Sequence, residues 1–256
     1  MKRAEGIQLE GVRKRFGTGA GMQEVLRGVD LVVPRGEVTV IIGRSGTGKS
    51  VLLKHVMGLM RPDAGVIRIG GQALTGLSDR ELRKERFRFG MVFQHAALFD
   101  SMDVYDNVAF PLREHSKLKE DQIRIRVEAM LASVGLEDAG RKQVNELSGG
   151  MRKRVGVARA MVRGPEFLLY DEPTTGLDPI MTAQIDALIR DTQDANPGLT
   201  SLVISHDMAA TFRIADKIAM LHEGQVILEG NAQTFHETDD PRVRQFVEGR
   251  LEGPIH

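Results

Sequence analysis

Eight consecutive residues in the first fifth of the chain have the spacing of a phosphate-binding loop. The run comprises Gly43, Arg44, Ser45, Gly46, Thr47, Gly48, Lys49 and Ser50. Its glycines would let the loop curl so that successive backbone N–H groups face phosphate oxygens, and a helix that follows would add its positive dipole end. We expect Lys49 to reach the β- and γ-phosphates and the Ser50 hydroxyl to ligate Mg²⁺. The alternative, a chance glycine-rich turn, is disfavoured by the strand before it and the helix after it.

Two acidic residues follow a later apolar run. Residues 167–170 read Phe-Leu-Leu-Tyr, and Asp171 and Glu172 come directly after them. Open α/β sheets bind their ligands at the carboxyl ends of the strands, so both carboxylates are expected to face the phosphates. Asp171 would hold Mg²⁺ through water, and Glu172 would orient and deprotonate the attacking water. The simpler alternative is a strand end followed by a capping acid.

A second helix start suited to an anion lies at Ser148, Gly149 and Gly150. Met151 and a basic run, residues 152–154, come next. A helix that opens in this way has backbone N–H groups free to bind an anion. One nucleotide cannot occupy two such sites in one small domain, so this site is expected to serve a nucleotide held by a second copy of the chain. Taken alone, the three residues would be an ordinary helix cap.

Three apolar runs and one amphipathic segment would position these groups. Residues 38–42 form an apolar, β-branched run, typical of a strand buried on both faces of a parallel sheet. Residues 167–170 and 201–204 have the same character. Within residues 49–60 five apolar residues fall on one helical stripe, namely Leu52, Leu53, Val56, Met57 and Met60, so the sequence predicts a strand, a glycine loop and a helix in succession.

The remaining segments are less specific. Residues 7–16 and 29–33 predict antiparallel strands on either side of a glycine-rich turn, and residues 96–162 are mostly helical in pattern. From about residue 236 the chain is polar and short of core residues.

The composition is that of an ordinary folded protein. The chain has 256 residues, of which 41% are hydrophobic and 27% charged, which suits one large or two small domains. It contains no cysteine, which excludes a disulfide scaffold, a thiolate metal site and a cysteine nucleophile. Because 35 Lys and Arg residues balance 35 Asp and Glu residues, we expect no nucleic-acid partner.

Hydropathy bears on location. No run approaches the roughly 18 consecutive apolar residues of a spanning helix, and the first residues lack the apolar core of a signal peptide. We therefore expect a protein made and kept in the cytoplasm, unless a partner holds it at a membrane.

Taken together, the motifs resemble those of the ATP-binding cassette (ABC) ATPases. The phosphate loop is followed in that family's order and spacing by MVFQ, LSGGM, LLYDEP, TGLDP and VISHD, and the resemblance runs from about residue 7 to 230. It implies an α/β P-loop NTPase fold, with a RecA-like parallel core sheet, an N-terminal antiparallel β subdomain and an inserted α-helical subdomain. It also implies ATP and Mg²⁺ as cofactors and ATP hydrolysis as the activity.

The resemblance assigns roles to residues that would otherwise be unremarked. By it, Phe16 stacks on adenine and Gln94 couples Mg²⁺ and water to a membrane partner. Asp178 is the acid of the loop that spans the dimer, and His206 contacts the γ-phosphate. Singly, Phe16, Gln94 and His206 would be a core aromatic, a surface amide and a strand-end histidine. The implied catalytic groups are Lys49, Gln94, Glu172 and His206, and the implied metal ligands are Ser50, Gln94 and Asp171.

Two positions depart from the commoner family pattern. Phe16 stands where tyrosine is usual, and stacking survives this change because it needs only a π face. Met151 stands where glutamine is usual, which could alter the polar contacts of that loop but leaves Ser148, Gly149 and Gly150 in place.

The resemblance also divides the chain. Residues 1–95 and 163–235 would form the nucleotide-binding core with its antiparallel β subdomain, residues 96–162 a helical signature subdomain, and residues 236–256 a C-terminal extension. The extension has too few apolar groups for a core of its own. We expect an extended segment whose Phe246 and Val247 dock on the other copy, the alternative being a frayed end.

Within the family, residues 93–115, the LSGGM signature, the GLDPI loop and residues 240–255 resemble the ATPases of bacterial phospholipid-trafficking (Mla-type) systems. That resemblance implies a peripheral protein on the cytoplasmic face of the inner membrane, moving phospholipids between the inner and outer membranes of a Gram-negative bacterium. Its partners would be a second copy, an integral membrane permease, a periplasmic protein of the mammalian-cell-entry class and a small cytoplasmic accessory subunit. Two alternatives stay open, the ATPase of a small polar-solute (amino-acid-type) importer and a non-transport regulatory ABC ATPase.

Overall fold

The computed structural model describes residues 6–255 as an α/β structure. Its strands are β1 (Ile7–Phe16), β2 (Gln23–Val33), β3 (Val38–Ile42), β4 (Ala64–Ile69), β5 (Gln72–Ala73), β6 (Phe89–Val92), β7 (Phe167–Asp171), β8 (Thr200–Ile204), β9 (Lys217–His222) and β10 (Gln225–Gly230). Its α-helices are α1 (Lys49–Val56), α2 (Asp79–Arg86), α3 (Val104–His115), α4 (Glu120–Ser133), α5 (Gly149–Met161), α6 (Pro179–Ala195), α7 (Met208–Ile214), α8 (Ala232–Glu237) and α9 (Pro241–Glu248). None of the helices in this described part combines the length and the apolar character needed to span a bilayer.

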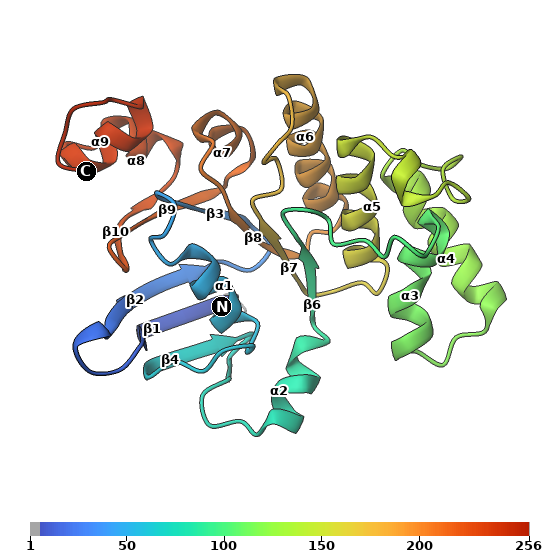
Figure 1. Ribbon diagram of the computed structural model, residues 1–256, viewed down its shortest axis with the longest axis horizontal. Coiled ribbons are helices and arrows are strands. Elements are labelled where there is room, and N and C mark those ends of the chain that lie inside the picture. The colour runs from blue at the N-terminus through green and yellow to red at the C-terminus, as the bar shows by residue number, and fades with distance from the viewer. Residues whose placement is uncertain (1–5, 256) are drawn as a thin grey trace.

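Two sheets organise the chain (Figure 1). One has the strand order β2-β1-β4-β5, with antiparallel neighbours, and the other has the order β10-β9-β3-β8-β7-β6. In the second sheet β3 pairs in parallel with β8 and β9, β7 with β6 and β8, and only the β9–β10 pair is antiparallel. The predicted parallel core sheet and antiparallel β layer are therefore both present.

Alternation along β3 divides the apolar residues into two cores. Val38, Val40 and Ile42 belong to one buried cluster with residues of α3 to α7, whereas Ile41 belongs to a second cluster with β1, β2, β4 and α1. Successive strand residues point to opposite faces, so a strand covered on both faces is mainly apolar, and in β3 only Thr39 among the five buried residues is polar. This is why the run at residues 38–42 could be identified as a buried strand.

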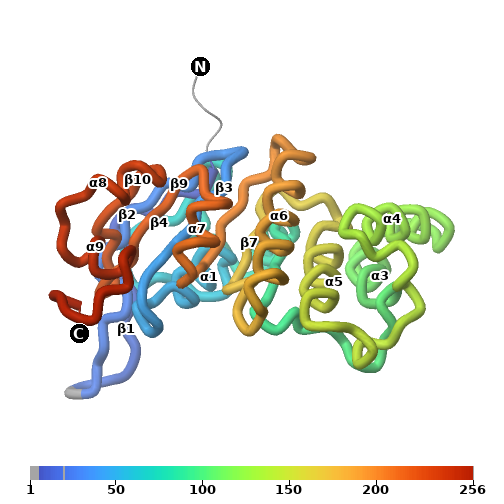
Figure 2. Tube along the Cα trace, turned by 90° about the horizontal axis from the view of Figure 1, so that it is seen from above, coloured from blue at the N-terminus to red at the C-terminus, as the bar shows by residue number. Residues whose placement is uncertain are grey.

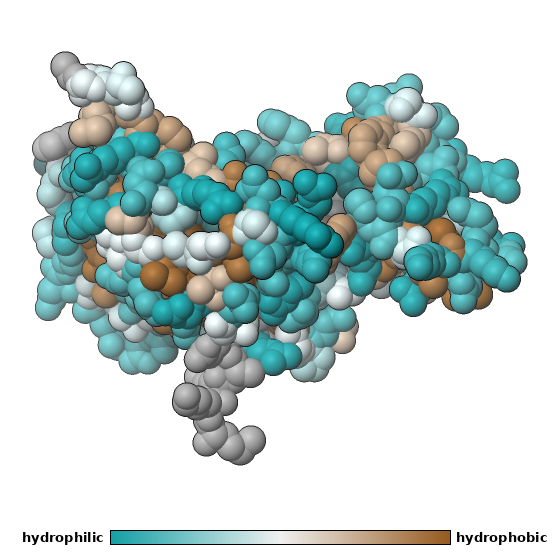
Figure 3. All heavy atoms as spheres, turned by 90° about the horizontal axis from the view of Figure 1, so that it is seen from below, coloured by the Kyte–Doolittle hydropathy of each residue, from teal (hydrophilic) through white to brown (hydrophobic). Residues whose placement is uncertain are grey.

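Helices lie at both ends of the long molecule. In two perpendicular views α3 and α4 lie at one end and α8 and α9 at the other (Figures 1 and 2). On the face shown in Figure 3, hydrophilic residues predominate and hydrophobic residues appear in separate patches.

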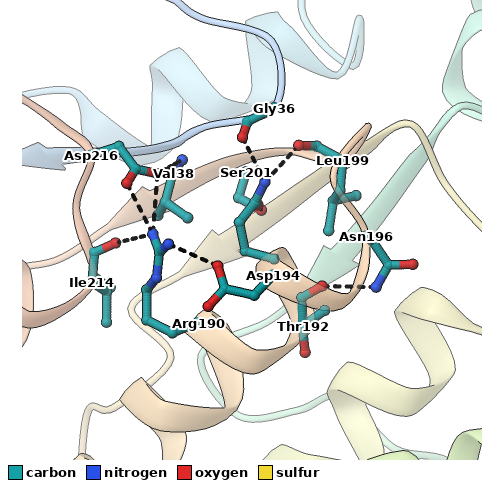
Figure 4. A network of polar contacts seen from close by, with 11 residues as sticks. Gly36, Val38, Arg190, Thr192, Asp194, Asn196, Leu199, Ser201, Ile214 and Asp216 are labelled. Atoms are coloured by element: carbon teal, nitrogen blue, oxygen red, sulfur yellow. Dashed lines mark hydrogen bonds and ion pairs between the residues drawn. The ribbon is translucent and has the colours of Figure 1, made fainter.

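The carboxyl-terminal half of α6 is bonded to the amino ends of the core strands (Figure 4). Arg190 donates to both carboxylate oxygens of Asp216, at 3.2 and 3.1 Å, and to Asp194. The buried Gln193 amide donates to the carbonyl oxygens of Gly36 and Leu199, at 3.0 and 2.8 Å. These bonds fix α6 at the amino ends of the core strands, whereas the phosphate loop follows the carboxyl end of β3.

Several predicted boundaries were wrong for local reasons. The first helix ends at Val56 rather than at residue 60, because Gly58 turns the chain with a left-handed backbone (φ +62°). Strand β2 begins at Gln23 rather than at residue 29, and its pairing with β1 shifts register three times, which hides the alternation of side chains. Strand β6 was not predicted, because its four residues include a glycine and are too few to show a period.

The C-terminal extension also differs from expectation, because its main part is a helix on the core of its own chain rather than an extended segment. Val243 is fully buried in the same cluster as β3, and Phe246 and Val247 pack against that cluster. Their spacing of three and four residues puts them on one helical face. Asp240, which caps α9, and the left-handed Gly249 after it are start and stop signals that sequence inspection could have used.

Replacement of Phe235 tests whether this end of the chain is part of the core. The Phe235 side chain is 1% exposed, so Phe235→Ala should lower the free energy of unfolding by about 3–5 kcal/mol through the cavity it leaves. Leu251→Ala, at a side chain that is 99% exposed, is the control and should change stability by less than about 0.5 kcal/mol. Equal urea midpoints for the two variants would contradict the packing of α8, the helix that leads into the extension, against the core.

Candidate active site

The phosphate loop leaves the carboxyl end of β3 and runs into the first turn of α1, which begins at Lys49. Gly43 has a left-handed backbone (φ +151°), and a Cβ there would lie 2.2 Å from the Leu221 carbonyl oxygen, so only glycine fits. Gly48, with φ +103°, caps α1. The Lys49 ammonium donates to the carbonyl oxygens of Gly43 and Arg44, at 2.6 and 2.8 Å. The Lys49 side chain thus lies across the phosphate loop, where it is expected to contact the phosphates of a bound nucleotide.

A cavity of about 490 Å³ adjoins the loop on the side of the antiparallel sheet. It is lined by loop residues 44–47, by β2 residues 23–25 and 27, by residues 222–224 and by Pro254 and Ile255 at the C-terminal end. Phe16, which is 39% exposed, pairs with Gln23 at the end of the β1–β2 hairpin. The predicted adenine-stacking ring is therefore solvent-accessible and close in the sheet to the cavity wall, without lining the cavity itself.

The oxygens of Ser50 and Asp171 approach each other across the site, with Ser50 Oγ 3.5 Å from Asp171 Oδ1. Mg²⁺ prefers oxygen ligands and is commonly bound through one or two protein oxygens plus substrate phosphates. Within residues 6–255 there is no group of three His, Asp or Glu side chains that could hold a metal by themselves. The donor set therefore fits a Mg²⁺ ion that takes some of its ligands from the protein and the others from the phosphates of a nucleotide.

Burial and neighbouring charges of both signs shift the pKa values of Lys49 and Asp171. Burial lowers the pKa of Lys49, and the carboxylates of Glu172 and Asp171 oppose that shift. Burial also raises the pKa of Asp171, and the charge of Glu172 adds to it, whereas Ser50 and Lys49 act in the other direction. A further cation between these carboxylates would relieve the repulsion that raises the Asp171 pKa.

Glu172 adopts a left-handed backbone (φ +48°) directly after β7. Its amide donates to the Ile204 carbonyl at 3.1 Å, and its Oε2 accepts from the Thr175 hydroxyl at 3.0 Å. His206 Nδ1 lies 3.5 Å from the same carboxylate oxygen, and the His206 side chain is 54% exposed. The structure thus brings together the predicted base and the predicted γ-phosphate contact.

Gln94 lies two residues after β6 and is half-buried. The main-chain carbonyl oxygen of Gln94 accepts a hydrogen bond from the ammonium of Lys153 on α5. Burial lowers the pKa of Lys153, and the carboxylate of Glu172 opposes that shift. Sequence inspection missed Lys153 because it lies within a basic run. Its spacing from Gly156 and Val157, which are buried on α5, was the available signal.

The predicted signature residues lie at the start of α5. The Ser148 hydroxyl caps this helix by accepting from the Met151 amide at 3.2 Å, and Gly149 lies against Leu177. Asp178 Oδ1 caps α6 by accepting from the amides of residues 180 and 181, each at 2.9 Å. Among the described residues no hydrogen bond or ion pair joins Ser148 or Asp178 to the phosphate loop. Both thus lie outside the group formed by Lys49, Ser50, Asp171, Glu172 and His206.

Comparisons with known proteins agree with this geometry. Residues 26–175 match the family model described as ABC transporter. The chain is 45% identical over 249 residues to the probable ribonucleotide transport ATP-binding protein mkl of Mycobacterium tuberculosis, covering 97% of this chain and 68% of that protein. It is 40% identical over 235 residues to the intermembrane phospholipid transport system ATP-binding protein MlaF of Escherichia coli K12, covering 92% and 87%.

The fold has solved counterparts. One is the dimeric structure of a post-hydrolysis state of the ATP-binding cassette MJ0796 bound to ADP and Pi, with a TM-score of 0.78 and 30% identity. The similarity covers 88% of this chain and 98% of that one. The fold class expected from the motifs is therefore confirmed.

Substitution of Glu172 tests its role as the general base. Glu172→Gln keeps the size and the polar contacts of the side chain but cannot take a proton, so hydrolysis should slow by about 10²–10⁴-fold. Binding of a fluorescent ATP analogue should persist, and long-lived ATP-bound dimers should accumulate on size-exclusion chromatography. Near-normal phosphate release by this variant would disprove the base assignment.

Proposed function

The chain belongs to the family of ABC transporter ATP-binding proteins and is an ATP hydrolase, and on that premise we propose that it drives the transport of phospholipid between two membranes. The observation that carries the proposal is the similarity to MlaF, which spans nearly the whole of both proteins. The longer mkl relative, named for ribonucleotide transport, supports the second candidate, a small polar-solute importer.

In this proposal the phosphate loop binds the nucleotide, and residues after β7 and β8 act on the γ-phosphate. The backbone N–H groups of residues 43–50 bind the phosphates, and Lys49 exchanges its two carbonyl partners for β- and γ-phosphate oxygens. Glu172 orients a water and takes its proton as the water oxygen attacks the γ-phosphorus. The bond from that phosphorus to the bridging oxygen breaks, which leaves ADP and phosphate, while His206 donates to a γ-phosphate oxygen.

Magnesium would be held by Ser50, Gln94 and Asp171, and it would neutralise phosphate charge as the bond breaks. The 3.5 Å approach of Ser50 to Asp171 supports this assignment. Phe16 would stack on the adenine, which its exposure at the hairpin end permits.

Two copies would form the complete site, each presenting Ser148, Gly149 and Gly150 to the nucleotide on the other's phosphate loop. The dimeric cassette with ADP and Pi supports this arrangement. Within residues 6–255 the Ser148 hydroxyl is bonded to the Met151 amide and not to the phosphate loop. Asp178, next to Gly149 through Leu177, would lie at the same interface.

The wider assembly follows from the same proposal. A membrane permease would receive the motion of the closing pair, with Gln94 linking nucleotide and permease. A periplasmic mammalian-cell-entry-class protein and a small accessory subunit would complete a system whose ATPase lies at the cytoplasmic face of the inner membrane. Within the chain, residues 96–162 would act as the signature subdomain and residues 1–95 and 163–235 as the nucleotide-binding core.

Isolation of the assembly tests the transported substrate. The tagged full chain should be purified in detergent from membranes of its own organism, and its proteins and lipids identified by mass spectrometry. We expect a permease and bound phospholipid, and ATP hydrolysis stimulated by phospholipid and abolished by Glu172→Gln. A permease complex without phospholipid, stimulated instead by a ribonucleotide or an amino acid, would favour the polar-solute importer. A chain that binds no permease would favour a regulatory ATPase.

Mixing of two inactive variants tests the shared site. Lys49→Ala disables the phosphate loop and Ser148→Arg disables the signature, so a mixed dimer keeps one site in which both partners are intact. Equal, random mixing should restore roughly a quarter of the wild-type hydrolysis rate, because half the dimers are mixed and each has one working site. In the control, Lys49→Ala is mixed with the double variant Lys49→Ala, Ser148→Arg, so that no dimer contains an intact phosphate loop. No recovery in proven mixed dimers would contradict independent shared sites.

A further inference from the structure

The main chain after Gln94 has an unusual conformation. Ala96 and Ala97 are consecutive left-handed residues, with φ +58° and +48°, and neither is glycine. Such residues persist only where the surroundings hold them, and they concentrate at functional positions. What holds this turn therefore bears on where Gln94 lies.

One side of α5 supplies that support. Arg159 donates to the carbonyl oxygens of Ala97 and Ala96, at 2.8 and 2.6 Å, and Lys153 donates to the carbonyl of Gln94. Between these two cations Gly156 lies so near the turn that an added Cβ would be 3.4 Å from the Ala96 side chain. A single helix thus bonds three carbonyl groups of a four-residue stretch.

Lys153 is the member of this set that stability explains least. Lys153 is 6% exposed, and within residues 6–255 its ammonium forms no ion pair but donates to the main-chain carbonyl of Gln94. A buried ammonium without a paired carboxylate is costly, and an apolar side chain would fill the same space. What a lysine can do at this position, and an apolar residue cannot, is donate a hydrogen bond and carry a positive charge.

We propose that Lys153 is a positioning residue that sets Gln94 against the nucleotide, by holding the Gln94 carbonyl while Arg159 holds the strained turn that follows. The inference rests on the proposed role of Gln94 as a ligand of the metal and the attacking water. On this proposal α5 serves two nucleotides. Its first turn faces the nucleotide held by the other copy, and its Lys153 places Gln94 beside the nucleotide held by its own chain.

The competing explanation is electrostatic. The charge of Lys153 lies close enough to Glu172 to influence it, so the lysine could act on the base or on the γ-phosphate directly. The two explanations differ in what they require. Positioning requires a hydrogen-bond donor at residue 153 and acts through Gln94, whereas the electrostatic effect requires a positive charge and does not involve Gln94.

Steady-state ATP hydrolysis by the full chain separates the two. Lys153→Met removes both donor and charge, and kcat should fall roughly tenfold to a hundredfold, as for other misplaced catalytic groups, with KM for ATP nearly unchanged. Lys153→Gln keeps a donor without charge and should recover a large part of that loss. Arg154→Met, which removes a neighbouring α5 cation bonded to Val134 and Gln184, is the matched control and should keep the wild-type kcat.

A double-mutant cycle completes the test. If Lys153 acts through Gln94, the double variant Gln94→Ala, Lys153→Met should be no slower than Gln94→Ala alone. Multiplied losses, or no recovery in Lys153→Gln, would overturn the positioning role while leaving the proposed function intact. An unchanged kcat in Gln94→Ala would instead overturn the role of Gln94 on which the inference rests.

A folding defect in Lys153→Met is detected by its melting temperature, and the inference then depends on Lys153→Gln and on hydrogen exchange. In the folded Lys153→Gln variant, amide exchange in a peptide covering residues 94–98 should stay close to that of the wild type. Faster exchange there together with a wild-type kcat would overturn the proposal.

Discussion

Two backbone hydrogen bonds at the carboxyl edge of the core sheet set the spacing of the candidate active site. The Ser205 amide donates to the Ile41 carbonyl and the Glu172 amide to the Ile204 carbonyl, each at 3.1 Å. They extend the pairing of β3 with β8, and of β8 with β7, by one residue beyond the strands. The phosphate loop, His206 and Glu172 therefore leave neighbouring strands at the same level, and the sheet that fixes them is buried on both faces.

That rigidity also permits strain. The left-handed backbone of Glu172 costs on the order of 1–3 kcal/mol, which is small beside the stabilisation from a strand such as β7, with four of its five residues buried. The strain turns the chain sharply, so that Asp171 and Glu172 can both face the site. Asp171 then lies beside Ser50, and Glu172 beside Thr175 and His206, which separates the proposed metal ligand from the proposed base one residue away.

The sequence carries much of this arrangement because its signals are local. Continuous apolar runs identify β3, β7 and β8, and glycine spacing identifies the loop, since only glycine tolerates the approach of Leu221 to Gly43. What could not be predicted depends on tertiary contacts. Lys153 looks like one more solvated charge until α5 is placed against the turn after Gln94, and the burial of Val243 depends on a surface that the core supplies. The four-residue β6 pairs in parallel with β7, a tertiary contact that its own short sequence does not signal.

The start of α5 explains why one chain is expected to hold only half of each site. The Ser148 hydroxyl already accepts from the Met151 amide, and within residues 6–255 the N–H groups of Gly149 and Gly150 have no hydrogen-bond partner at the positive end of this thirteen-residue helix. Gly149 lies against Leu177, and Gly150 lies against Met181 on α6. A negatively charged group brought by a second copy would meet these N–H groups directly. Because Lys153 and Arg159 lie on the same helix, any displacement of α5 on meeting that group would also displace the two cations that donate to the main-chain carbonyls of Gln94 and Ala96.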